Sequence, residues 1–223
     1  MRLVRENSAL DAKFKDYRMA SGEVLSVLSG FLTLASVGPY IRDILRGRTV
    51  PHRTSWLIFA ALAAIATGSQ IRVGASSGAW MTAGAALGFS IVSFLSIRRG
   101  VGGFERSDAL TLGIVIAGMV AWLLTNEAIV ALVATITVEV AAIVLTVRKA
   151  FIDPWSETLS TWVLDALAGL TAICAVAAFN FSKLLYPVHH LVANLAVALS
   201  IVCGRARRSR SGSVAPNVVN ATL

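Results

Sequence analysis

The sequence predicts an all-helical membrane protein with seven transmembrane helices. Apolar residues make up 56% of the chain and charged residues only 14%, a balance typical of integral membrane proteins. A helix needs roughly 17–25 mostly apolar residues to cross a hydrocarbon core about 30 Å thick. Seven apolar runs approach or reach that length, at residues 24–41, 54–70, 79–97, 110–124, 129–147, 161–179 and 186–203. In addition, one sequence pattern occurs twice and divides these helices into two groups.

The repeated pattern joins the end of one helix to the start of the next. It consists of a basic loop, a proline, small hydroxyl residues, and a tryptophan at the start of the following helix. The first copy contains Pro51 and Trp56, and the second contains Pro154 and Trp162. The two tryptophans lie about 100 residues apart, and self-similarity over such a period indicates a duplicated membrane unit.

This duplication sets the predicted organisation of the chain. The span at 110–124 has no ionisable residue and is predicted as a linker, because three helices reverse the direction of the chain and one added span restores it. The N-terminal tail has no apolar segment typical of a cleaved signal peptide, and we expect a surface helix or disorder there. The predicted regions are a polar tail at 1–23, a first three-helix repeat at 24–97, a linker helix with its loops at 98–128, a second three-helix repeat at 129–203, and a basic tail at 204–223.

The first helix carries a stripe of small polar residues that includes Ser29 and Thr33. Three- and four-residue spacing places such residues on one face. Two interpretations stay open: the stripe lines a solute path, or its small side chains let helices pack closely in lipid. Pro39, near the end of this helix, lacks a backbone donor and is a candidate hinge.

The third, fifth and sixth helices add further candidates. Ser90 and Ser93 lie deep in the third helix and could contact a solute. Glu139 lies midway along the fifth helix, where an ionised carboxylate costs about 2.5–3.5 kcal/mol on insertion scales, so it should face the bundle interior or water. No Lys or Arg lies in the apolar part of any span to pair with Glu139, and we expect it to exchange protons during transport. Asp165, in the sixth helix, is a second candidate for proton coupling, or an acid that stabilises the N-terminal end of its own helix.

The seventh helix places His190 and Asn194 on one face, as candidate contacts for a solute. A polar amide at this depth needs hydrogen-bond partners that lipid does not offer. The neighbouring His189 and His190 could instead simply lie at the membrane interface. No metal site is predicted, because the residue one turn after His190 is an asparagine rather than a second histidine. No cofactor is expected, and the absence of nucleophile-elbow, zinc-hydrolase and Walker sequences argues against an enzyme.

The charged residues predict the orientation and the partners. Most lysines and arginines fall in loops on one side, including Arg42, Arg98, Arg148 and Arg207, so the C-terminus is predicted in the cytoplasm and the N-terminus outside. The net charge of +8 then reflects topology and contact with anionic membrane lipid. Nucleic acid is not predicted as a partner, because the basic tail is short and lacks interleaved aromatic residues. A homo-oligomer stays open.

These features together resemble the PQ-loop superfamily, which includes the SWEET sugar transporters. The likeness is carried by GRTVPHRTSWLIFAALAAIATGSQ and DPWSETLSTWVLDALAG, extends from Val24 to Cys203, and is closest to an uncharacterised bacterial group of seven-helix SWEET-like proteins. The chain departs from the superfamily in lacking its Pro-Gln pair, because Pro39 is followed by Tyr40 and the fifth helix has no proline.

The resemblance implies a transporter in the bacterial plasma (inner) membrane. Two PQ-loop-type three-helix repeats would enclose a central cavity and alternate between outward-open and inward-open states, moving a small polar solute. In the sugar transporters an asparagine from the third helix of each bundle contacts the solute, and Asn194 matches this position in the second bundle. In proton-coupled members an acidic residue on the fifth helix titrates, and Glu139 matches it. The alternative is a receptor or assembly protein that uses the same fold without transporting, because fold does not determine function.

Overall fold

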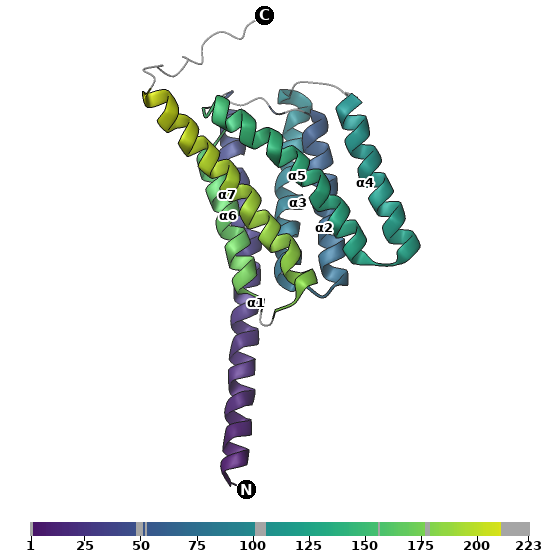
Figure 1. The fold of residues 1–223 in the computed structure, drawn as a ribbon, viewed down its shortest axis with the longest axis vertical. Coiled ribbons are helices and arrows are strands. Elements are labelled where there is room, and N and C mark those ends of the chain that lie inside the picture. The colour runs from purple at the N-terminus through teal and green to yellow at the C-terminus, as the bar shows by residue number, and fades with distance from the viewer. Residues whose placement is uncertain are drawn as a thin grey trace, which may run out of the picture.

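A computed structural model confirms the predicted all-helical class (Figure 1). It describes residues 2–47, 51, 53–100, 106–155, 157–176 and 179–210, and no strand occurs among them. The helices are α1 (Arg2–Leu45), α2 (Arg53–Arg72), α3 (Ser76–Arg99), α4 (Arg106–Thr125), α5 (Ala128–Ile152), α6 (Leu159–Cys174) and α7 (Phe181–Arg210). α1 begins inside the predicted polar tail, and its N-terminal part projects beyond the other helices (Figure 1).

Each predicted span lies inside one helix, except the sixth. The span predicted at 161–179 is too long, because α6 ends at Cys174. The Asn180 Oδ1 atom accepts a hydrogen bond of 3.1 Å from the Lys183 backbone N–H. This cap satisfies a backbone donor of the first turn, and α7 accordingly begins at Phe181, earlier than predicted. Apolar composition continues through this connection and therefore hides the helix boundary from a hydropathy argument.

Several helices have the length and composition of membrane spans. Among the described residues, three helical segments are long and apolar enough to cross a bilayer: Ala20–Leu45, Ser76–Arg99 and Phe181–Arg210. Shorter apolar segments occupy Trp56–Arg72, Ala128–Val140 and Leu159–Cys174. Large apolar side chains such as Phe31 and Phe94 are largely exposed on the outside of the helices, as is typical of surfaces that face lipid. These properties indicate a membrane protein.

The helices pack in two groups with the same order of neighbours. In the first group α3 lies between α1 and α2, and in the second group α7 lies between α5 and α6. The groups meet where α1 packs on α6 and where α2 packs on α5. α4 packs on α5 and α2 at the edge of the molecule (Figure 1).

Glycines permit the close approach of helices within each group. A methyl group at Gly30 of α1 would lie 2.5 Å from the Trp80 carbonyl oxygen of α3. A methyl group at Gly169 of α6 would lie 2.8 Å from the Leu191 backbone nitrogen of α7. In lipid, helix association depends on such backbone proximity and on van der Waals packing, because apolar side chains gain little by leaving an apolar solvent.

Candidate solute cavity

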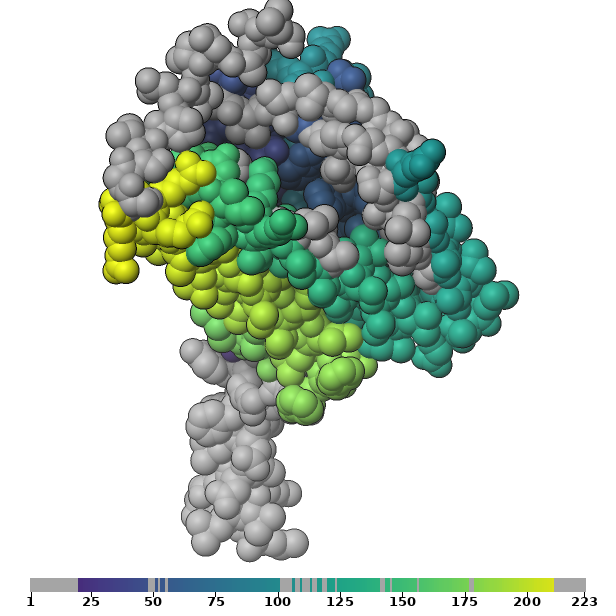
Figure 2. Space-filling model, turned by 45° about the horizontal axis from the view of Figure 1, so that its top comes forward, coloured from purple at the N-terminus to yellow at the C-terminus, as the bar shows by residue number. Residues whose placement is uncertain are grey.

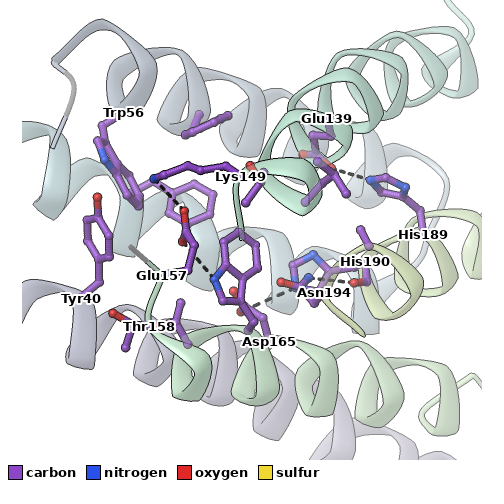
Figure 3. Close-up of a pocket in the computed structure, with 17 residues that line it drawn as sticks. Tyr40, Trp56, Glu139, Lys149, Glu157, Thr158, Asp165, His189, His190 and Asn194 are labelled. Atoms are coloured by element: carbon purple, nitrogen blue, oxygen red, sulfur yellow. Dashed lines mark hydrogen bonds and ion pairs between the residues drawn. The ribbon is translucent and has the colours of Figure 1, made fainter. Parts of the chain in front are cut away.

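A cavity of about 340 Å³ lies between the two groups of helices (Figure 3). Its lining comes from α1, α2, α3, α5, α6, α7 and the connection between α5 and α6, and α4 contributes none of the lining residues that the structure describes. The lining residues are Tyr40, Trp56, Phe59, Phe89, Glu139, Ile143, Thr146, Lys149, Glu157, Thr158, Thr161, Trp162, Asp165, His189, His190, Ala193 and Asn194.

The cavity extends from the middle of the bundle toward one end. At that end lie Tyr40, near the C-terminus of α1, Trp56, near the N-terminus of α2, and Lys149, near the C-terminus of α5. Figure 2 is turned so that this end comes forward, and the surface is hollowed between α5, in green, and the blue N-terminal helices.

An apolar cluster lies toward the opposite end of the bundle. Ala66, Met81, Leu132, Ala172 and Tyr186 pack together there and are buried, with contributions from α2, α3, α5, α6 and α7. We call this set the closing cluster. Because it lies between the cavity and the far end of the helices, the cavity is accessible from one end only within the described part of the chain.

One side of the cavity is an aromatic wall supplied by the first group of helices. It consists of Tyr40, Trp56, Phe59 and Phe89. The Trp56 ring lies 4.8 Å from the Tyr40 ring, 5.5 Å from the Phe89 ring and 5.9 Å from the Phe59 ring, measured between centroids. Tilted and edge-on arrangements at these distances are favourable aromatic contacts, so the wall is a rigid surface for a flat or apolar group.

The facing side is polar, and Glu139 of α5 is held there by two residues of α7. The Tyr186 hydroxyl donates a hydrogen bond of 2.9 Å to Glu139 Oε1, and His189 Nε2 lies 3.0 Å from Glu139 Oε2. No Lys or Arg was expected beside Glu139, and its basic neighbour is a histidine, because α7 packs against α5 and brings His189 to the carboxylate. Thr135, one turn earlier in α5, donates to the Ala131 carbonyl of its own helix instead.

Asp165 of α6 forms the second acid–histidine pair. Asp165 Oδ1 accepts a hydrogen bond of 2.8 Å from the Ser36 hydroxyl of α1, and His190 Nε2 lies 3.6 Å from the same oxygen. The second distance exceeds hydrogen-bond length but permits an ion pair when the imidazole is protonated. The His190 ring also stacks on Tyr186, with centroids 6.1 Å apart. Asp165 is buried, and it accepts this hydrogen bond from another helix. Its two suggested roles, proton coupling and stabilisation of the start of its own helix, stay predictions.

A third polar group lies at the accessible end. Lys149 Nζ of α5 forms an ion pair of 3.0 Å with Glu157 Oε1, and Trp162 Nε1 donates a hydrogen bond of 3.2 Å to the other oxygen of Glu157 (Figure 3). The Thr158 hydroxyl lies 3.5 Å from Asp43 Oδ2, which links this connection to α1. The carboxylate of Glu157 thus has both a cation and a neutral donor.

Asn194 lies in the cavity wall beneath His190. Its Nδ2 atom donates a hydrogen bond of 2.7 Å to the His190 carbonyl oxygen, one turn earlier in α7. No hydrogen bond from another described residue reaches Oδ1. The amide is therefore oriented by its own helix and has an acceptor available on the cavity side.

The structure does not bring Ser29, Thr33, Ser90 or Ser93 into the cavity lining. Ser29 and Thr33 are buried in the packing of α1, where their hydroxyls donate to the carbonyls of Ser26 and Ser29. Their burial favours the second interpretation of the stripe, in which its small side chains let helices pack closely. Gly30, on the same helix, also contacts α3. Ser90 is exposed and Ser93 half-buried, both outside the cavity.

The remaining predicted residues occupy two kinds of position. Trp56 and Trp162 line the cavity on opposite groups of helices, whereas Pro51 and Pro154 are buried in the connections before them. Pro39 lies inside α1, which continues to Leu45 without a break in the helix. The hinge role of Pro39 stays a prediction.

Sequence reasoning missed several residues of the site, notably Tyr40, Glu157, Tyr186 and the partnership of His189 with Glu139. Tyr186 and Glu157 lie close in sequence to predicted site residues but were assigned no role. A signal was present: an acid on each of two helices and two adjacent histidines on a third suggest two pairs. The hydropathy pattern says nothing of which helices are neighbours, and so could not match each histidine to its acid.

No protein-family model, no curated protein and no solved structure matches the chain. The geometry and chemistry of the cavity are therefore the only guide to the function of the protein.

Proposed function

We propose that the protein is a SWEET-like membrane transporter that moves a small polar solute by alternating access. The observation that carries the proposal is a cavity with charged and polar side chains in its wall, accessible from one end and closed at the other by the closing cluster. Buried ionisable residues in a membrane protein are costly and occur chiefly where they serve a solute or ion path.

The packing of the helices supports a 3+1+3 arrangement of PQ-loop type. Both groups of three helices have the same order of neighbours, with the third helix of each group in its middle. The contacts between the two groups are also symmetric, because the first helix of each group packs on the second helix of the other. α4 lies outside the cavity, as a linker helix would. Such internal symmetry is the usual basis of alternating access, in which one bundle moves relative to the other around a central site.

The distribution of basic residues supports an inward-open state. Arg42, Arg98, Arg99 and Lys149 lie near the helix ends at which the cavity is accessible, and basic residues mark the cytoplasmic side of membrane proteins. We therefore propose a bacterial plasma-membrane protein with its N-terminus outside, its C-terminus in the cytoplasm and the closing cluster near the outer surface.

Uptake into vesicles that contain the purified protein tests this proposal. Radiolabelled sugars, amino acids and organic amines would be screened, and uptake of at least one class above protein-free vesicles is expected. Replacing Ala193, which lines the cavity, by Trp should then abolish uptake by filling the space that the solute occupies. Leu199→Trp is the matched control, because Leu199 lies on the same helix with its side chain 61% exposed on the outer surface.

Uptake by the Ala193→Trp protein at the level of the control would show that the cavity is not the solute path. Failure of every solute class to enter the vesicles, although the folded protein binds one of them, would favour the receptor alternative instead.

A further inference from the structure

The charges around the cavity do not balance. Among the described lining residues, three carboxylates, Glu139, Glu157 and Asp165, face one permanent cation, Lys149. Lys149 lies 3.0 Å from Glu157 and compensates it. Glu139 and Asp165 remain, and each of them has a histidine rather than a lysine or arginine as its basic neighbour.

The two histidines therefore set the net charge of the cavity. With neutral imidazoles Glu139 and Asp165 leave two negative charges uncompensated, and with both imidazoles protonated the two pairs are neutral. The other titratable groups around the pairs are the phenols of Tyr40 and Tyr186, which carry no charge near neutral pH. A carboxylate away from water needs a counter-charge, because burial of an unpaired ion is costly. Either a proton on histidine or a cationic solute can supply it.

The aromatic wall favours a particular kind of cation. Tyr40, Trp56, Phe59 and Phe89 present ring surfaces to the same cavity whose opposite side carries the two acids. Ring faces attract organic ammonium groups through their quadrupole and pack well against apolar or flat bodies. An anionic solute would meet the carboxylates, and an inorganic cation would gain little from the aromatic surface.

We propose that the solute is a small organic cation with an apolar or aromatic body, and that it exchanges for protons held by the Glu139–His189 and Asp165–His190 pairs. This inference rests on the proposed transport function and deepens it. When the cation enters, the N–H bond of an imidazolium breaks and its proton passes to water at the accessible end. The cation then takes the place of that proton beside the carboxylate, so the charge of the cavity is conserved and no covalent bond to the solute forms.

Binding to the purified full-length protein tests the proposal without requiring transport. Benzyltrimethylammonium is a suitable probe, because its charge does not change with pH and any pH dependence then belongs to the protein. Titration calorimetry should show binding that weakens by about tenfold or more between about pH 8 and about pH 5.5, the range in which histidine takes up protons. Comparing buffers of different ionisation enthalpy should reveal proton release on binding at the lower pH. Neutral benzyl alcohol and anionic 3-phenylpropionate should bind at least about tenfold more weakly.

Variants separate the two parts of the inference. Glu139→Gln with Asp165→Asn should lose affinity for the cation, whereas Glu127→Gln, an exposed carboxylate at the start of the same helix as Glu139, should bind like the wild type. His189→Gln with His190→Gln should still bind the cation but lose the pH dependence. The proton-release measurement uses the wild-type protein and gives an answer even where a double variant does not fold.

The proposal is overturned if the neutral or anionic probe binds as tightly as the cation, if no cation binding is detected, or if binding releases no protons and is independent of pH. Cation binding with proton release but without uptake into vesicles would support this inference while contradicting the transport proposal. Uptake of a neutral solute by a protein that does not bind the cation would support the transport proposal and contradict this inference.

Discussion

At the scale of residues, the arrangement of the site depends on two consecutive histidines of α7. Neighbouring residues of a helix point about 100° apart, so His189 and His190 address different partners. His189 reaches Glu139 on α5, and His190 lies beside Asp165 on α6. Tyr186, one turn earlier, donates to Glu139 and stacks on His190, so it contacts both pairs. One helix thereby connects the two acidic residues that the cavity contains at mid-bundle.

The first prediction concerns Glu139 as the residue that couples transport to protons. Glu139→Gln keeps the size of the side chain but removes the carboxylate beside which His189 holds its proton, and Asp165 remains to attract the solute. The variant should fold and still exchange solute across vesicles, and it should lose accumulation driven by a pH gradient. Glu127→Gln is the control, because Glu127 is an exposed carboxylate directly before the same helix. Gradient-driven uptake by Glu139→Gln protein at the wild-type level would end the coupling hypothesis.

A second prediction concerns Asn194, whose Oδ1 atom is available to a solute. A neutral hydrogen bond contributes about 0.5–1.5 kcal/mol, so Asn194→Ala should weaken solute binding by roughly threefold to tenfold. Calorimetry on the purified variant measures this change, and Ser200→Ala is a control, because Ser200 is buried on the same helix but lies outside the cavity lining. Unchanged affinity in a folded Asn194→Ala protein would make Asn194 a packing residue.

At the scale of elements, the polar stripe of α1 has two uses along its length. Near the N-terminal side Ser29 and Thr33 lie in the tight packing of α1, with hydroxyls bonded to carbonyls. One turn further, the Ser36 hydroxyl lies 2.7 Å from the Thr33 carbonyl of its own helix and 2.8 Å from Asp165 Oδ1, across the boundary between the two groups of helices. The hydroxyl of a serine or threonine can donate to a carbonyl one turn earlier in its own helix. Such residues can therefore lie either in tight helix packing or at the boundary between the two groups.

The third prediction tests the close packing of α1 on α3. Gly30→Ala adds a methyl group 2.5 Å from the Trp80 carbonyl, so the helices must separate, and the free energy of unfolding should fall by about 1–3 kcal/mol. Gly38→Ala is a matched control on the same helix, because a methyl group there meets nothing within 4 Å. Thermal unfolding in detergent measures both variants. Equal stability of the two would show that α1 and α3 pack less closely than described.

At the scale of the whole molecule, the cavity has one accessible end and one closed end. The aromatic wall comes from the first group of helices, and both acid–histidine pairs involve residues of the second. A solute bound between them would contact both groups at once. Movement of one group relative to the other would then change which end is accessible without requiring a new site.

The fourth prediction is topological. With Cys174 and Cys203 replaced by Ala, a cysteine introduced at Ser209 should resist membrane-impermeant thiol reagents in intact cells, because the basic end of the molecule is predicted to face the cytoplasm. A cysteine introduced at Glu127, exposed at the opposite end, should react. The reverse pattern of labelling would invert the orientation and with it the proposed inward-open state.

The sequence by itself determined the all-helical class and the approximate position of most helices. Apolar runs of membrane length predict helices, because lipid leaves a backbone few other ways to satisfy its hydrogen bonds. The same reasoning predicted that Glu139 and Asn194 are functional, because a polar side chain in an apolar run is costly unless it has a partner or faces water. It could not place the end of α6, because apolar residues continue past Cys174.

Only the tertiary structure decided which polar residues share a cavity. Periodicity assigns Ser29 and Glu139 each to a face of its own helix, but it does not say what that face meets. The structure directs the Ser29 face into helix packing and brings Glu139 to His189 at 3.0 Å. These pairings depend on contacts between helices far apart in the chain. A hydrophobic pattern indicates which face of each helix meets lipid, but it does not specify which helices become neighbours.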